Sequence, residues 1–303
     1  MSSRKHPLHR LRGILFMIAA VFVFSIMDAL MKHLSAHYVP LQIACLRALS
    51  SLICLLPAIA WQRSWRSLRP TQPWLHGLRG ALGIVMLTSF VFAVHRLTLA
   101  QTYSLFLAVP LLMTALSVPI HGERVTARRW LIIAVGLCGV LVILQPWNKG
   151  PFSMVAAAAA AIAAVCYALS ALTVRTLGPG NSSLSMAFWY LGLVGVASGL
   201  LAWRDWSPVA AGDWLWLAAI GVSGARGQLW LTEAFRRAPP SVVAPFEYTA
   251  ILWAFLIDWV FWSASPSVSL LIGAGIVVTS GIVVILDEHR LAGRPMSAAL
   301  PMP

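Results

Sequence analysis

Two charged side chains lie well inside apolar stretches of segment 221–262, Arg226 in the first stretch and Glu247 in the second. A charge at bilayer depth costs at least about 2.5–3.5 kcal/mol, so it faces a partner or a water-filled cavity rather than lipid. A guanidinium offers carboxylates a planar fork, and a carboxylate can balance an amine or bind a proton. Arg226 and Glu247 therefore indicate either a binding site for a small charged solute or a structural ion pair between two helices.

Three prolines stand at or before the start of the stretch that carries Glu247, namely Pro239, Pro240 and Pro245. Each lacks a backbone N–H, which loosens the first turns of the expected helix. Charged groups beside a weakened helix near the membrane midplane are what a solute pathway needs. We expect this segment to contribute to such a pathway.

Further charged and aromatic residues complete the set of candidates. Asp28 near the outer end of the first span and Arg47 in the second could form a structural pair. Arg79 is expected to extend its guanidinium to the membrane interface, and Asp258 to reach water. Aromatic side chains with a polar handle could wall a cavity. These are Tyr103, Tyr167, Trp189, Tyr190, Trp230 and Tyr248.

The composition places these residues in a membrane protein. The chain has 303 residues, of which 59% are hydrophobic and 10% are charged, and its mean hydropathy is +0.81. A soluble chain of this length carries about a quarter charged residues. The net charge of +13 would suggest nucleic acid in a soluble chain, but basic residues retained on cytoplasmic loops explain it here. We therefore expect lipid and a solute as partners, and no nucleic acid.

A spanning helix needs about 20 mostly apolar residues, and on this rule the chain contains about ten such segments. The loops on one side are rich in Lys and Arg, whereas the opposite loops carry few. Those few are Lys32, Arg96, Lys149 and Arg204. The segments centre near Val21, Leu52, Val85, Leu111, Gly136, Ala161, Val194, Ile220, Leu252 and Val277. The bias predicts an even number of spans with both termini in the cytoplasm.

An internal repeat relates the two halves of the chain at a shift of about 142 residues. The shift superimposes pairs at equivalent places in each half: Trp61 on Trp203, Trp74 on Trp216, and Leu144 on Leu286. Because five spans are an odd number, the second copy enters the membrane in the opposite orientation, as in transporters that rock around a midplane site. The shift places Ile84 and Leu105 where the second half has Arg226 and Glu247. The scaffold itself therefore does not require those charges.

The sequence gives little support for an enzyme, a disulfide framework or a metal site. Gly221-Val222-Ser223-Gly224 fits the GxSG pattern of an intramembrane serine protease, but the only later histidine is His289 in the C-terminal tail. The cysteines lie in apolar spans without a CxxC pattern, so we expect neither disulfides nor a metal site. They are Cys45, Cys54, Cys138 and Cys166. A structural or signalling membrane protein is a third class, which the inverted repeat disfavours. We expect no catalytic residue and no cofactor.

Two motifs resemble the EamA branch of the drug/metabolite transporter superfamily. The first runs from Leu97-Thr98-Leu99-Ala100 through Pro110 to His121-Gly122-Glu123-Arg124. The second half departs from it, since Ser263-Ala264-Ser265 stands where a Gly-Glu is expected. The run 240–249, PSVVAPFEYT, resembles a subgroup with carriers of riboflavin, carriers of S-adenosylmethionine-like metabolites, and an exporter of the opine-type metallophore pseudopaline. The resemblance implies transport of small polar metabolites without ATP hydrolysis, and the chain lacks a GxxxxGK[ST] phosphate loop.

These observations predict an all-α integral membrane protein of the bacterial inner membrane, with ten transmembrane helices in two inverted five-helix repeats. We expect a cytoplasmic tail at 1–12, repeats at 13–145 and 146–287, and a second cytoplasmic tail at 288–303. The expected function is export of an amino-acid-derived compound such as an opine-type metallophore. Uptake of riboflavin or an S-adenosylmethionine-like metabolite is the alternative. Substrate, direction, coupling ion and oligomeric state stay open.

Overall fold

A computed structural model describes residues 5–61, 68–121, 126–144, 153–177, 181–237 and 244–292 of the chain. Within these ranges the chain is helical and contains no strand. Six segments are long and apolar enough to cross a membrane. They are Leu11–Leu34, Pro40–Trp61, Pro73–Arg96, Leu99–Ile120, Met154–Val174 and Ser183–Ala202. Shorter apolar helices cover Trp130–Ile143 and Val268–Val283. The prediction of an all-α, multi-pass membrane protein is therefore confirmed.

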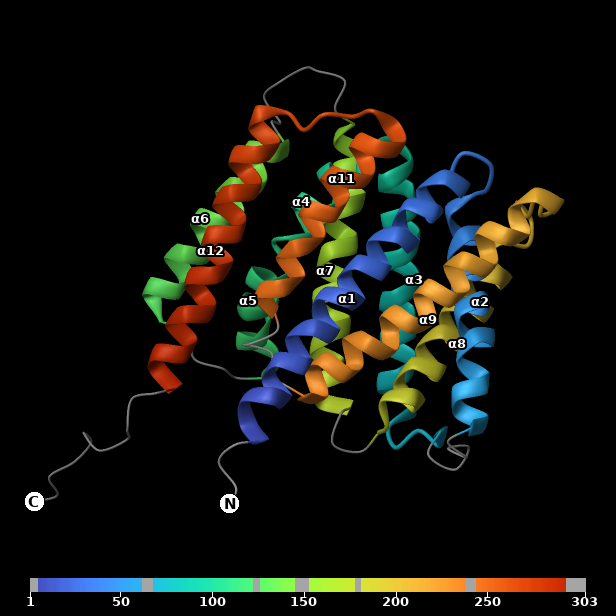
Figure 1. The fold of residues 1–303 in the computed structure, drawn as a ribbon, viewed down its shortest axis with the longest axis horizontal. Coiled ribbons are helices and arrows are strands. Elements are labelled where there is room, and N and C mark those ends of the chain that lie inside the picture. The colour runs from blue at the N-terminus through green and yellow to red at the C-terminus, as the bar shows by residue number, and fades with distance from the viewer. Residues whose placement is uncertain are drawn as a thin grey trace, which may run out of the picture.

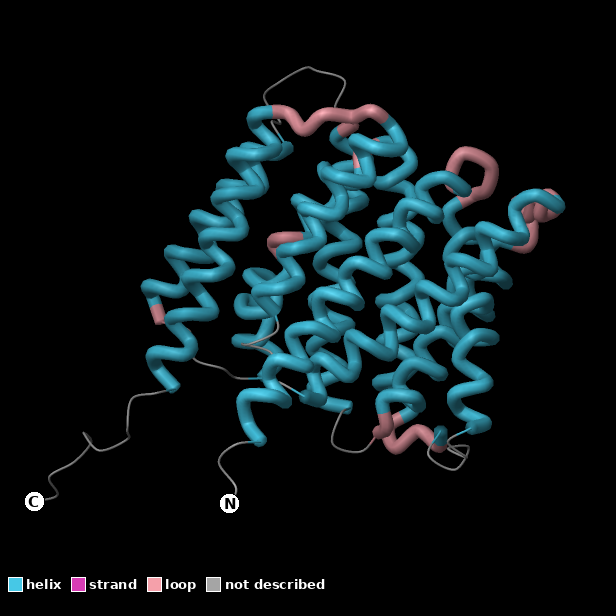
Figure 2. The backbone as a smooth tube through the Cα atoms, in the orientation of Figure 1, coloured by secondary structure: helices cyan, strands magenta, loops and turns pink. Residues whose placement is uncertain are grey.

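The helices follow one another with short connections. In chain order they are α1 (Lys5–Leu34), α2 (Pro40–Trp61), α3 (Pro73–Arg96), α4 (Leu99–Phe106), α5 (Val109–His121), α6 (Ala127–Leu144), α7 (Met154–Leu177), α8 (Ser183–Ala202), η3 (Ala211–Asp213), α9 (Trp214–Arg237), η4 (Ala244–Thr249), α11 (Ala250–Trp262) and α12 (Val268–Ala292). Each of the ten centres expected from hydropathy lies within one of these helices. Most loop segments lie at the two ends of the bundle (Figure 2), and α1 begins at the same end at which α12 finishes (Figure 1).

A shift of 142 residues maps helices of the first half onto helices of the second. It moves α2 to 182–203, where α8 covers Ser183–Ala202, and α3 to 215–238, where α9 covers Trp214–Arg237. The packing follows the same relation: α1 packs along α9 as α3 packs along α7, while α2 pairs with α8 and α6 with α12. Figure 1 shows α6 and α12 side by side at one flank of the bundle. Each half therefore packs mainly against the other half.

The fourth segment of each half is interrupted. In the first half the break lies at Leu107 and Ala108, between α4 and α5. Pro110 is the second residue of α5, where its missing N–H is tolerated. The shift carries the break to Thr249 and Ala250, where the 3₁₀ helix η4 gives way to α11. Pro245 lies in that 3₁₀ helix, in accord with the expected loosening, whereas 239 and 240 lie outside the described residues.

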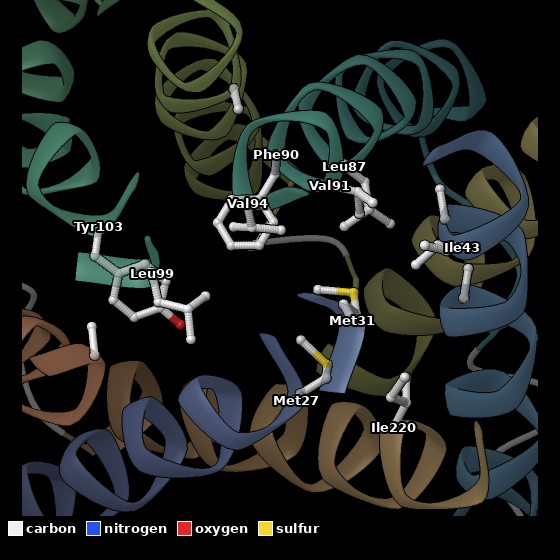
Figure 3. Packing of buried hydrophobic residues seen from close by; sticks show 14 of the residues in the cluster. Met27, Met31, Ile43, Leu87, Phe90, Val91, Val94, Leu99, Tyr103 and Ile220 are labelled. Atoms are coloured by element: carbon white, nitrogen blue, oxygen red, sulfur yellow. The ribbon is translucent and has the colours of Figure 1, made fainter. Parts of the chain in front are cut away.

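The core is built from apolar side chains of both halves. Figure 3 shows Phe90 and Val94 of α3, Tyr103 of α4, and Met27 and Met31 of α1 pointing toward one interior. In lipid, burial of apolar area does not hold helices together, so close packing of small and apolar side chains does so instead.

Two glycines bring α6 and α12 into backbone contact. A Cβ at Gly273 would lie 2.7 Å from the carbonyl oxygen of Gly139, and a Cβ at Gly139 would lie 3.0 Å from the carbonyl oxygen of Gly273. We predict that Gly273→Ala lowers the free energy of unfolding by about 1–3 kcal/mol, because backbone cannot yield as a flexible side chain can. Thermal unfolding in detergent measures this. Gly275→Ala is the matched control, since nothing lies within 4 Å of a Cβ there. Equal melting temperatures for the two variants would contradict the prediction.

Candidate functional site

Arg79 lies in the first turns of α3 and is buried, with 7% of its surface exposed. Its Nη1 donates a hydrogen bond to the carbonyl oxygen of Met186 at 3.0 Å, and its guanidinium carbon lies 4.8 Å from the ring centroid of Tyr190. Its Nε is buried and has no hydrogen-bond partner among the described residues. The expectation that Arg79 reaches the interface is therefore wrong, because α8 covers the face of α3 from which it projects.

Two tyrosines, Tyr190 and Tyr167, interact with this arginine, and Glu247 interacts with the second of them. Glu247 in η4 interacts electrostatically with Tyr167 of α7 and with its neighbour Tyr248. Tyr167 also interacts electrostatically with Tyr190 and Arg79. Tyr167 therefore lies within reach of both a buried cation and a carboxylate. We call Arg79, Tyr167, Tyr190 and Glu247 the Arg79 cluster.

Tyr248 is held against α12 rather than beside a polar partner. It is buried, and its hydroxyl has no hydrogen-bond partner among the described residues. The hydroxyl oxygen occupies the space that a Cβ at Gly281 would need. A glycine at this position of α12 is thus required for the tyrosine to fit.

A second polar cluster lies where α1 ends and where α2 and α4 begin. The Tyr103 hydroxyl donates a hydrogen bond to the carboxylate of Asp28. Arg47 donates from Nε to the sulfur of Met27 at 3.4 Å, and its buried Nη1 has no hydrogen-bond partner in the described chain. Arg47 acts electrostatically on Asp28, but no ion pair within 4.0 Å joins them. We call Asp28, Arg47 and Tyr103 the Asp28 cluster.

The hydrogen bond between Tyr103 and Asp28 supports a prediction. Tyr103→Phe removes the donor from a buried carboxylate, and hydrogen bonds to charged groups contribute about 1.5–3 kcal/mol. We expect the free energy of unfolding to fall by that amount, as measured by thermal unfolding in detergent. Tyr248→Phe is the matched control, since the buried Tyr248 hydroxyl has no hydrogen-bond partner among the described residues. A control variant that loses as much stability as Tyr103→Phe would refute the assignment.

Asp258 ties three helices together at the end of the bundle where α4 begins. It forms an ion pair with Lys32 at 3.1 Å and accepts hydrogen bonds from the backbone N–H groups of Leu99 at 3.2 Å and Ala100 at 2.7 Å. Lys32 also lies 4.4 Å from the ring centroid of Trp262. The expectation that Asp258 reaches water is wrong, since its side chain is 2% exposed. Asp258 instead caps α4 and links α1, α4 and α11.

A second set of contacts closes the same end between the two halves. Tyr38 donates to Asp213 at 2.5 Å and accepts from the backbone N–H of Ala210 at 3.0 Å. Gln42 exchanges two hydrogen bonds with the backbone of Ser207, at 2.6 Å and 3.0 Å. The turn between α1 and α2 is thereby fastened to the segment that leads into α9.

Arg226 is not brought to Glu247. It lies on the exposed face of α9 with Leu215, Ala219 and Val222, and no described carboxylate pairs with it within 4.0 Å. Trp230, one turn further along α9, is half-buried. The part of either residue in binding stays a prediction.

Ser223, the candidate nucleophile of a protease, has a hydrogen-bond partner within its own helix. The Ser223 hydroxyl donates to the carbonyl oxygen of Ala219 in its own helix, at 2.6 Å. All four cysteines are free. The described residues contain no group of three or more His, Cys, Asp or Glu side chains placed to hold a metal ion.

Comparisons with known proteins assign the chain to a family. The model of the EamA-like transporter family matches residues 11–145 and 154–286. The pseudopaline exporter CntI of Pseudomonas aeruginosa is 30% identical over 89% of this chain and 94% of its own. The riboflavin transporter of Vibrio cholerae is 28% identical over 99% of this chain and its full length, and the S-adenosylmethionine uptake transporter of Rickettsia prowazekii is 24% identical over 92% and 94%.

A solved crystal structure has the same fold: it superimposes with a TM-score of 0.66 and covers 92% of this chain and 98% of its own, at 20% identity. The relatives are transporters of small metabolites and not enzymes, as the sequence predicted. The chain therefore belongs to the EamA-like transporter family of multi-pass membrane proteins.

Proposed function

We propose that this chain is a secondary transporter of the bacterial inner membrane that exports a small, amino-acid-derived metabolite. In this proposal ten segments span the membrane, the repeats cover 13–145 and 146–287, and the tails 1–12 and 288–303 lie in the cytoplasm. The relation between helix bounds at a shift of 142 residues and the paired packing of the halves support it. The Lys and Arg bias of the loops supports the orientation.

One observation carries the proposal: two clusters of buried and half-buried charges lie toward opposite ends of the bundle, largely on equivalent helices. The Asp28 cluster uses α1, α2 and α4, and the Arg79 cluster uses α7, α8 and η4, which are their counterparts in the second half, together with α3. Each cluster offers a cation, a carboxylate and a tyrosine. A solute with amines and carboxylates can pass from one cluster to the other as the halves rock against each other.

The proposed binding residues come from several helices. They are Asp28, Arg47, Tyr103, Tyr167, Arg226, Trp230, Glu247 and Tyr248. Carboxylates of the solute suit the guanidinium groups, and its amines suit the carboxylates. An opine-type metallophore has both kinds of group, and a relative at 30% identity is a pseudopaline exporter. Without a phosphate loop, a gradient or exchange drives the movement.

Expression in Pseudomonas aeruginosa that lacks its pseudopaline exporter tests this function. We expect the chain to restore extracellular pseudopaline and to lower the intracellular pool, as measured by mass spectrometry. The membrane level of the protein is followed by an epitope tag. An unchanged partition of pseudopaline, with the protein present in the membrane, would end the proposal for this substrate.

Uptake is the second candidate, because riboflavin and S-adenosylmethionine transporters are also among the relatives. Growth of a riboflavin auxotroph that expresses this chain, at limiting external riboflavin, distinguishes uptake from export. Uptake of labelled S-adenosylmethionine into the same cells tests the other substrate.

A further inference from the structure

Arg79 is a buried cation for which the described residues supply no ion-pair partner. Its guanidinium carbon faces the ring of Tyr190 and one nitrogen donates to a backbone carbonyl, but no described carboxylate lies within 4.0 Å. A buried charge that no opposite charge balances destabilises the protein that contains it. The charge of Arg79 therefore costs folding free energy that an apolar side chain of similar size would not cost.

The geometry leaves one edge of the guanidinium available. Nη1 is used by the Met186 carbonyl at 3.0 Å, whereas Nε is buried and has no partner in the described chain. Nε and a terminal nitrogen form the fork that accepts a carboxylate in two parallel hydrogen bonds. A guanidinium with an unpartnered Nε that also lies against an aromatic ring can bind a planar anion.

The carboxylate of Glu247 acts on the same tyrosine, Tyr167, as Arg79 does. This tyrosine interacts electrostatically with both Arg79 and Glu247, and Glu247 pairs with no described cation within 4.0 Å. Arg79 and Glu247 thus share Tyr167 as an electrostatic neighbour, and neither forms an ion pair within 4.0 Å among the described residues.

We propose that Arg79 binds a carboxylate of the transported solute against the ring of Tyr190. The inference rests on the proposed transport function and adds the site that recognises the substrate class. It competes with a structural role, in which Arg79 only fastens α3 to α8 through Met186, and with capture of an anionic lipid headgroup.

Thermal unfolding of the purified protein in neutral detergent tests the inference without a known substrate. The probe is succinate, with neutral succinamide at equal ionic strength as its reference. We expect succinate to stabilise the wild-type protein and the half-effective concentration to rise at least about 30-fold in Arg79→Met. Arg96→Met is the matched control, since Arg96 lies on the same helix and is exposed, with Phe92 as its contact.

The ligand-free variants separate a binding role from a structural one. If Arg79 serves binding, Arg79→Met melts at the same temperature as the wild type or higher, because a buried unpaired charge is removed. A lower melting temperature together with no effect of succinate would show a fastening role and overturn the inference. Stabilisation by phosphatidylglycerol but not by succinate, again lost in Arg79→Met, would assign the site to lipid and also overturn it.

Transport assays keep this inference distinct from the proposed function. Pseudopaline export that falls at least about 30-fold in Arg79→Met, but not in Arg96→Met, supports both. If the wild type stabilises with succinate through Arg79 but moves no pseudopaline, the site stands and the substrate is another carboxylate. Pseudopaline export that Arg79→Met leaves unchanged would refute the site and leave the function intact.

Discussion

Asp258→Ala is expected to lower the free energy of unfolding by about 3–5 kcal/mol, because it leaves the Lys32 ammonium without its counter-ion in a largely buried place. The same change strips the acceptor from the backbone N–H groups of Leu99 and Ala100. These groups begin α4, so the first turn of that helix loses two acceptors and its link to α11, while the capping box of Thr98 and Gln101 remains. No other variant considered removes contacts to so many helices at once.

Thermal unfolding in detergent measures the effect, and Asp205→Ala is the control, since Asp205 is exposed in the segment after α8. Lys32→Met separates the two parts of the interaction: it removes the cation while Asp258 keeps both backbone hydrogen bonds. We expect it to destabilise less than Asp258→Ala. If Asp258→Ala has the same melting temperature as the wild type, the ion pair and the two backbone hydrogen bonds of Asp258 do not hold this end of the bundle together.

Glu247→Ala is expected to reduce transport at least about 30-fold while the protein remains folded in the membrane. Glu247 has no described cation within 4.0 Å, so its removal leaves no partner stranded. A structural ion pair would behave differently, since breaking it would lower the amount of folded protein. Export of pseudopaline per unit of membrane protein is the measurement.

Arg226→Ala tests the other half of the same hypothesis. Because Arg226 is exposed on α9 and pairs with no described carboxylate, its loss should leave stability unchanged. Lower transport by a folded Arg226→Ala would retain this arginine as a binding residue. If Arg226→Ala transports normally while Glu247→Ala does not, Arg226 takes no part in substrate binding, and the Arg79 cluster alone recognises the substrate.

Hydropathy located the helices well, because a helix that spans lipid needs about 20 mostly apolar residues, and such a run is visible in the local sequence. Each expected centre lies in a helix, and the repeat at 142 residues matches the helix bounds. The break at Leu107 and Ala108 was not predicted, although Pro110 stands just after it. A proline can kink a continuous helix or begin a new one, and local sequence does not distinguish these outcomes.

The candidate site was harder to predict from the sequence, because its contacts join residues that are distant in the chain. Asp258 lies 226 residues from Lys32 and 158 from Ala100, so no local pattern marks its burial. Arg79 did carry a usable signal. Gly83 stands four residues on, on the same helix face, and a Cβ there would meet the ring of Tyr190. An arginine on a face that a neighbouring helix covers closely has no open route to the interface.

The packing of α1 against α9 has a consequence for biogenesis. The N-terminal helix leaves the ribosome long before Trp214–Arg237 is translated, so it waits in the bilayer without its principal neighbour. A nascent chain released before that point would present the face of Phe24 and Met27, which Gly227 and Gly224 later cover. On such an incomplete chain this face of α1 would stay uncovered, and membrane proteases and insertases could recognise it.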